Sequence, residues 1–193
     1  LDTLPERQIL SGYAEIVKYG LIKNRQFFEW LEVNGKKILL GDPDARRTAV
    51  VESCKTKAAI VGHDEKETGE RAILNFGHTF GHAIETFQRY TGLLHGEAVA
   101  VGMAMAAELS MLSGALSQKD MDRIKALIAS FSLPVAPPQA MQADDFMALM
   151  VRDKKVLDGQ LRLVLLNGIG SAVVTADFRL QLLEETLDKA CHR

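Results

Sequence analysis

Four polar side chains recur along one side of an otherwise apolar segment, RAILNFGHTFGHAIETF, at residues 71–87. Arg71, Asn75, His78 and His82 stand at intervals of four, three and four residues. In a helix that turns about 100° per residue, they fall within a strip roughly 60° wide. The residues between them are typical of a protein interior, where an unpaired polar group costs about 1–3 kcal/mol. We therefore predict a buried helix, over about residues 71–90, whose polar stripe is satisfied by a metal ion and a polar substrate.

Composition excludes several other classes of protein. The 193 residues are 47% hydrophobic and carry a net charge of −2, which argues against disorder and against nucleic acid or an anionic membrane as a partner. The longest apolar stretch, residues 98–116, contains Glu108 and is predicted to be a packed core helix, not a membrane span. Cys54 and Cys191 are expected to be free thiols of a cytoplasmic protein.

Apolar periodicity and turn residues predict a mostly helical chain. Asn34-Gly35 is expected to end the second helix, and Asp42 or Asp44 to cap the third. The predicted helices cover about residues 5–20, 26–33, 42–61, 71–90, 97–112, 120–129, 143–152 and 178–190.

A different pattern follows residue 152. The runs LRLVLL and SAVVT lie near Asp158-Gly159 and are predicted to form a small β-hairpin. The fold class is therefore mainly α: a helical bundle-like domain with a small β-hairpin near the C-terminus, in which residues 1–193 form a single domain.

The histidines of the stripe are candidate metal ligands. His78 and His82 are one helical turn apart, a spacing that can chelate a metal, although such pairs are more often structural. Gly77 and Gly81 repeat at the same interval and weaken a helix by about 1 kcal/mol each. Their presence predicts the close approach of another backbone.

Two further residues complete a candidate ligand set. His95 precedes a predicted helix in the sequence LHGE, and Glu15 lies among apolar neighbours. Two histidines and one carboxylate leave open coordination positions on zinc, as a catalytic site requires. His63 and His192 are expected to be solvated.

Cations form the other half of the pattern. Lys57 lies on an otherwise apolar helix face, Arg71 opens the stripe, and Lys154 and Lys155 precede the predicted hairpin. Each cation alone is typical of a solvated surface. Together with a metal they indicate a local pocket for an anionic small molecule, in which arginine supplies a bidentate clamp and lysine a point charge.

The chain resembles a known family, the 3-dehydroquinate synthases, over nearly its whole length. The matching segments are LPERQILSGYAEIVKYGLI, SCKTKAAIVGHDEKETGERAILNFGHTFGHAIE, LHGEAVAVGM and RDKKVLDGQLRLVLL. The resemblance implies the mostly α, metal- and substrate-binding C-terminal domain of that family. It also implies that an N-terminal NAD-binding domain is absent from this chain, that the isolated chain is inactive, and that the full-length enzyme is a homodimer.

The resemblance assigns roles residue by residue. Glu15, His78 and His95 are expected to bind Zn²⁺ (or Co²⁺), and His82 to hydrogen-bond the substrate and shuttle a proton. Glu67 matches a position assigned as an acid or base in some relatives. The positions expected to contact substrate are Lys18, Lys57, Arg71, Asn75 and one of Lys154 and Lys155.

The implied reaction belongs to the shikimate pathway of aromatic amino acid biosynthesis. The family converts the sugar phosphate 3-deoxy-D-arabino-heptulosonate 7-phosphate to 3-dehydroquinate with loss of phosphate, a lyase reaction that uses NAD⁺ catalytically. Three alternatives stay open: a metal-dependent alcohol or glycerol dehydrogenase, another sugar-phosphate cyclase, and a non-catalytic, zinc-stabilised helical module.

Overall fold

The computed structural model describes residues 3–64, 69–152, 156–157 and 160–192. Its centre is α5 (His95–Leu112), which packs against α1 (Glu6–Ile22), α4 (His78–Phe87), α6 (Gln118–Ser130) and α8 (Leu180–Cys191). All residues from 98 to 110 of α5 are buried, because the helix is almost entirely apolar or small-sided. The exception, Glu108, is paired with Lys125 of α6. The predicted core helix is thus confirmed, and none of the helices described is long and apolar enough to cross a membrane.

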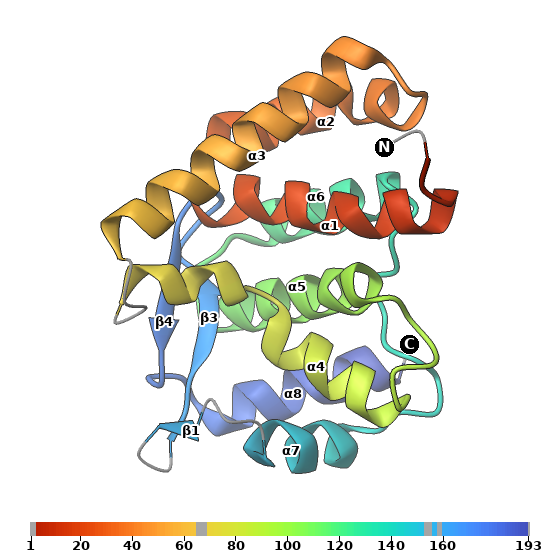
Figure 1. Ribbon diagram of the computed structural model, residues 1–193. Coiled ribbons are helices and arrows are strands. Elements are labelled where there is room, and N and C mark those ends of the chain that lie inside the picture. Colours follow the sequence, from red (N-terminus) through yellow and green to blue (C-terminus); the bar gives the residue numbers. More distant parts are fainter. Residues whose placement is uncertain (1–2, 65–68, 153–155, 158–159, 193) are drawn as a thin grey trace.

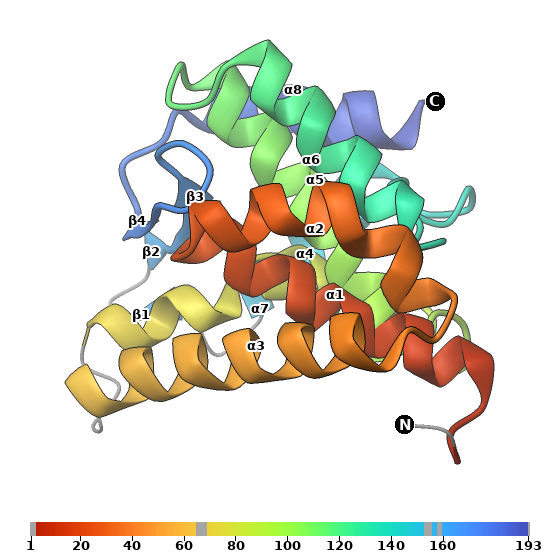
Figure 2. The same ribbon diagram turned by 90° about the horizontal axis from the view of Figure 1, so that it is seen from above.

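Three helices cover one side of α5. Figures 1 and 2 show α1, α2 (Arg25–Leu39) and α3 (Pro43–His63) stacked there, with α4, α7 (Ala143–Arg152) and α8 on the other side. Asp42 caps α3, as one of the two predicted alternatives, by accepting a hydrogen bond from the Ala45 backbone N–H at 2.8 Å.

The predicted end of the second helix at Asn34-Gly35 is wrong, because α2 continues to Leu39. A Cβ atom on Gly35 would lie 3.1 Å from Cζ of Phe131. Gly35 therefore provides room for a buried aromatic ring and does not stop the helix.

The predicted continuous helix over residues 71–90 is also wrong. The chain forms a 3₁₀ helix, η1 (Glu70–Asn75), and then turns at Gly77, whose φ of 80° lies in the left-handed region that glycine adopts without strain. Helix α4 begins only at His78. Arg71 and Asn75 consequently stand on a separate element from His78 and His82.

The glycine repeat in this region does have the predicted cause. A Cβ on Gly77 would lie 2.7 Å from the Met103 backbone nitrogen, and one on Gly102 would lie 1.9 Å from the Gly77 carbonyl oxygen. Real Cβ atoms do not approach backbone so closely, so α4 and α5 meet there backbone to backbone.

The C-terminal part contains the predicted hairpin. Strand β3 (Leu163–Leu166) pairs antiparallel with β4 (Ala172–Thr175), and the turn between them uses Gly168 and Gly170 at positive φ. A shorter antiparallel pair, β1 (Val156–Leu157) with β2 (Gln160–Leu161), precedes it. Helix α8 ends the described chain near its predicted place.

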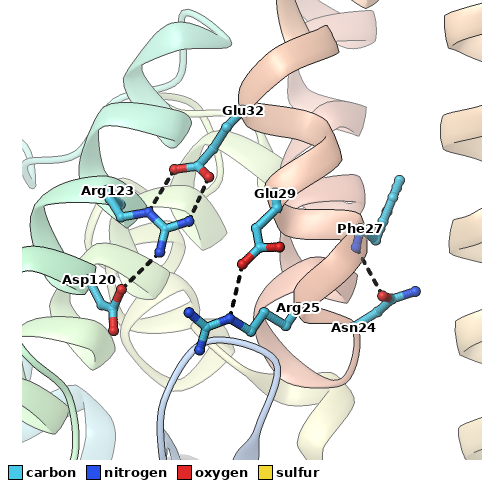
Figure 3. A network of polar contacts seen from close by, with 7 residues as sticks. All are labelled: Asn24, Arg25, Phe27, Glu29, Glu32, Asp120 and Arg123. Atoms are coloured by element: carbon cyan, nitrogen blue, oxygen red, sulfur yellow. Dashed lines mark hydrogen bonds and ion pairs between the residues drawn. The ribbon is translucent and has the colours of Figure 1, made fainter.

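A charged contact joins α2 to α6 at the surface (Figure 3). The Arg123 guanidinium donates to both carboxylate oxygens of Glu32, at 3.0 and 2.7 Å, and to Asp120 at 3.0 Å. The same guanidinium lies 5.3 Å from the centre of the Phe28 ring. Bidentate geometry of this kind fixes the relative position of two elements better than a single ion pair does.

We expect Glu32→Gln to lower the free energy of unfolding by about 1 kcal/mol, because it removes a bidentate charge-assisted contact between two helices. Urea unfolding followed by circular dichroism measures the change. The matched control is Glu29→Gln, which removes an exposed pair with Arg25 inside α2 and should change stability by only about 0.3 kcal/mol. Equal effects of the two substitutions would contradict the bridging role of Glu32.

Candidate metal and substrate site

Three side chains from separate elements meet at one point. Glu15 comes from α1, His78 is the first residue of α4, and His95 is the first residue of α5. One potential ligand atom of each lies within 4.8 Å of those of the other two, and the two imidazole centres are 5.3 Å apart. Glu15 and His78 are half-buried and His95 is exposed. The set can hold a divalent ion while leaving coordination positions open to a substrate.

The start of α5 is fixed to α1 by contacts on both sides of His95. The Gly96 N–H donates to Ser11 Oγ at 3.0 Å. The Glu97 carboxylate accepts hydrogen bonds from the Leu94 N–H at 2.7 Å and from the Arg7 guanidinium at 2.7 and 2.6 Å. Gly96 and Glu97 thus hold the start of α5 against α1, and His95, the residue before them, lies near Glu15 of α1.

The charge on Glu97 is favoured in this setting. Burial raises the pKa of the Glu97 carboxyl, but the hydrogen bonds from Arg7 and Leu94 and the Arg7 charge outweigh it, so the pKa lies below its ordinary value. Glu97 is therefore ionised at neutral pH, where a carboxylate at the first turn of α5 also suits the helix dipole.

The imidazoles have defined partners for their Nδ1 atoms. His78 Nδ1 lies 3.2 Å from the carbonyl oxygen of Phe76, and His95 Nδ1 lies 3.1 Å from a carboxylate oxygen of Glu85. Both partners are acceptors, which favours the tautomer with hydrogen on Nδ1 and a lone pair on Nε2. In this tautomer Nε2 is the ring atom that would bind a metal.

One turn further along α4 the site widens into a pocket of about 510 Å³. His82, half-buried, lines this pocket together with Glu85 and His95. The His82 ring centre is 5.6 Å from that of His78 and 6.1 Å from that of His95. His82 is thus close enough to the candidate metal position to touch a ligand bound there.

A buried cation stands directly behind the candidate ligand set. Lys18 is 3% exposed, and its Nζ contacts both carboxylate oxygens of Glu15 at 3.0 and 2.8 Å. Burial lowers the pKa of the Lys18 ammonium, the charge and hydrogen bond of Glu15 oppose that shift, and the charge of Lys57 adds to it. The ion pair holds the Glu15 carboxylate in one orientation.

The other predicted substrate contacts lie on neighbouring elements. Lys57 is exposed on α3, and Arg71 and Asn75 are half-buried on η1, which packs against both α1 and α3. The Arg71 backbone N–H donates to Asp64 at 3.0 Å. Lys57 and Arg71 therefore stand on elements that pack against α1, the helix that carries Glu15.

Glu67, Lys154 and Lys155 lie outside the described residues. His63 and His192 are exposed, in accordance with the expectation that they are solvated.

Glu85 is the residue near the site that we did not predict from the sequence. It lies in the apolar segment as GHAIE and is buried beside His95. The sequence did contain a sign of this role, because Glu85 stands three residues after His82 on an apolar helix face, where a buried acid requires a partner.

Gly96→Ala should disrupt the site from a position that carries no ligand. A Cβ there would lie 1.9 Å from the Ser11 carbonyl oxygen, so the start of α5 has to move away from α1. We expect a loss of about 1–3 kcal/mol in the free energy of unfolding, as for other overpacking substitutions, and weaker zinc binding in a chelator competition.

The matched control for this prediction is Gly12→Ala on α1, where the new Cβ meets no heavy atom within 4 Å. That substitution should keep zinc affinity and raise stability by up to about 1 kcal/mol through helix propensity. Unchanged stability and zinc affinity in Gly96→Ala would show that the α1–α5 contact does not position His95.

Comparisons with known proteins match the chain to one family. Residues 12–156 match the family described as 3-dehydroquinate synthase C-terminal. The 3-dehydroquinate synthase of Teredinibacter turnerae is 53% identical over 191 residues, which are 99% of this chain and 53% of that protein. The 3-dehydroquinate synthase of Nitrosococcus oceani is 54% identical over 190 residues, which are 98% of this chain and 53% of that protein. The chain thus spans about half the length of the curated relatives it matches.

Solved structures with the same fold have related activities. The 2-epi-5-epi-valiolone synthase of Streptomyces hygroscopicus subsp. jinggangensis, with NAD⁺ and Zn²⁺ bound, aligns with a TM-score of 0.86 at 29% identity, over 96% of this chain and 51% of that one. A 2-deoxy-scyllo-inosose synthase complexed with carbaglucose-6-phosphate, NAD⁺ and Co²⁺ aligns with a TM-score of 0.84 at 26% identity. The alignment covers 98% of this chain and 54% of that one.

Proposed function

Because the chain belongs to the 3-dehydroquinate synthase family, we propose that it forms the metal- and substrate-binding part of such an enzyme. The reaction would convert 3-deoxy-D-arabino-heptulosonate 7-phosphate to 3-dehydroquinate and phosphate. The observation that supports this most strongly is the meeting of Glu15, His78 and His95 beside a buried lysine. That constellation joins a metal-binding set to groups that attract an anion.

The proposed metal is Zn²⁺ or Co²⁺, held by Glu15, His78 and His95. Two imidazoles and one carboxylate suit either ion, and the similar synthases carry Zn²⁺ or Co²⁺ together with NAD⁺. When bound, such an ion polarises an oxygen ligand and stabilises negative charge on it. We propose that NAD⁺ is also required, and that it is bound mainly by a part of the enzyme outside these 193 residues.

The side chains around the metal position have distinct proposed tasks. His82 lines the pocket next to the ligand set, where its imidazole can accept the proton of a substrate hydroxyl and pass it towards solvent. Lys18 holds Glu15 in place through its ion pair. Lys57, Arg71 and Asn75, on α3 and η1, bind the carboxylate and phosphate groups and so orient the substrate for each step.

The second candidate function is that of another sugar-phosphate cyclase, which the similarity to valiolone and inosose synthases favours. The two candidates use the same residues and differ in the carbon skeleton of the substrate. A simple metal-dependent dehydrogenase ranks lower, because it does not require the Arg71 and Asn75 pair or the surrounding lysines.

We expect turnover in a protein extended at its N-terminus to the length of its relatives, assayed as NAD⁺- and metal-dependent phosphate release from 3-deoxy-D-arabino-heptulosonate 7-phosphate. Arg71→Ala should reduce kcat/KM at least about tenfold by removing a charged contact and should keep one bound metal. The 193 residues alone should be inactive, because they contain no glycine-rich dinucleotide signature.

Two outcomes of that assay would contradict the proposal. Release of phosphate from a hexose 6-phosphate, but not from the heptulosonate, would assign the chain to another cyclase. Turnover by the 193 residues alone would show that NAD⁺ binding does not depend on a further domain.

His78→Ala should lose about one equivalent of bound zinc, because two remaining ligands hold the ion poorly. Metal content after dialysis, measured by atomic emission, checks this. His63→Ala is the matched control, since His63 is exposed at the end of α3 and its loss should leave the zinc content unchanged. Full zinc content in His78→Ala would remove the basis of the metal assignment.

Removal of zinc with a chelator should leave the helical content of the chain unchanged and lower Tm by only a few degrees. The reason is that the hydrophobic core surrounds α5, whereas the candidate ligands lie at its edge and are half-buried or exposed. A structural zinc module would unfold under the same treatment. Loss of the far-ultraviolet circular dichroism signal on chelation would therefore favour the non-catalytic alternative.

A further inference from the structure

Glu85 is a buried acid whose partner is a candidate metal ligand. It lies in the last turn of α4 with 9% of its side chain exposed, and its Oε1 is 3.1 Å from Nδ1 of His95. An ionised carboxylate is expensive to bury unless it is paired and hydrogen-bonded. The position of Glu85 therefore calls for an explanation in terms of what His95 does.

His95 has little packing of its own to fix its orientation. Its side chain is 52% exposed, whereas His78 is half-buried and has its Nδ1 beside the Phe76 backbone carbonyl oxygen. An exposed imidazole at the start of a helix samples several rotamers. Fixing one of them when a metal binds costs conformational entropy, which weakens the binding of the metal. A fixed hydrogen bond to Nδ1 removes much of that freedom.

We propose that Glu85 is a positioning residue for His95, and this proposal rests on the proposed metal site. The carboxylate accepts the Nδ1–H of His95, selects the tautomer with a lone pair on Nε2, and turns that lone pair towards Glu15 and His78. A carboxylate does this more strongly than a carbonyl oxygen, because its charge also increases the basicity of the imidazole. Glu85 thus acts on the metal through His95 and does not touch it.

The same atoms also permit a different arrangement, in which Glu85 is itself a ligand. Potential ligand atoms of His82, Glu85 and His95 lie within 4.8 Å of one another. An ion held by these three residues would be a second one, beside the ion held by Glu15, His78 and His95. To bind both ions, His95 would have to use both of its ring nitrogens, as an imidazolate. The 3.1 Å contact between Nδ1 and Oε1 is instead the length of an ordinary hydrogen bond, which favours the positioning role.

The test compares zinc affinity in Glu85→Gln, Glu85→Ala and the parent chain, measured by chelator competition. We expect one zinc per parent chain. The affinity should fall about tenfold in Glu85→Gln, which keeps an acceptor but loses the charge, and by about 10- to 100-fold in Glu85→Ala. Glu184→Gln, which changes an exposed acid on α8, is the matched control and should bind zinc as the parent does.

Two further readouts separate positioning from a structural role. The metal-free Tm of Glu85→Gln should equal that of the parent, while its zinc-induced rise in Tm is smaller, because the stabilisation by bound zinc increases with the logarithm of its affinity. The visible absorption spectrum of the Co²⁺-loaded chain should also change in Glu85→Gln. A lower metal-free Tm with parental zinc affinity and an unchanged Co²⁺ spectrum would overturn the proposal.

The remaining outcomes are equally distinct. Parental affinity in Glu85→Gln would overturn the positioning role and leave the proposed function intact. Two zinc ions per parent chain and one in Glu85→Gln would make Glu85 a ligand, which also overturns it. A parent chain that binds no zinc would remove the proposed metal site itself, and the positioning role with it.

A measurement on the unsubstituted chain does not depend on any variant folding. Nitrogen-15 spectra of the metal-free protein, taken above the ordinary histidine pKa of about 6.5, should show His95 with its hydrogen on Nδ1. A hydrogen on Nε2 would overturn the proposal.

Discussion

The direct backbone contact between the start of α4 and the middle of α5 is the constraint on which the site depends. Gly77, Gly81 and Gly102 remove the side chains that would otherwise separate the two helices. Helices without side chains at their contact approach more closely than the 8–10 Å usual for packed helices. This close approach brings the two elements that carry His78 and His95 together, and the remaining candidate groups are arranged around it.

The core and the site have separate physical origins in this protein. The core is made by the apolar α5 and the helices that surround it, through contacts between apolar side chains. The candidate site is assembled from the first residues of α4 and α5 and from one face of α1. Helix starts are well placed for this purpose, because they lie at the surface of the core and yet are held by the helices that follow.

Much of the fold could be predicted from the sequence, and the errors have clear physical causes. Local signals located the core helix and the β3–β4 hairpin, and they offered Asp42 as one of two possible caps of α3. The errors at Gly35 and Gly77 arose because a glycine marks a helix end, a left-handed turn or a tight tertiary contact, and only the packing partner distinguishes these. Phe131 is that partner for Gly35, and it stands far away along the chain.

The site was harder to predict than the fold. Spacing drew attention to His78 and His82. Glu15 and His95 come from distant segments, so the sequence offered them only as further candidates, and the family resemblance assigned them as ligands together with His78. Glu85 was missed because a single acid on an apolar helix has no distinctive spacing. Its significance emerges only when His95 of the next helix is seen to face it.

The ion pair between Lys18 and Glu15 has a consequence for the protein before any metal arrives. The Lys18 ammonium balances the charge of the Glu15 carboxylate and contacts both of its oxygens, so the carboxylate already has a fixed orientation without a metal. An incoming divalent ion then finds one ligand already held in place, and little of its binding energy is consumed in reorienting Glu15. The same lysine limits how negative the site becomes, so that the local field stays compatible with a substrate that is itself an anion.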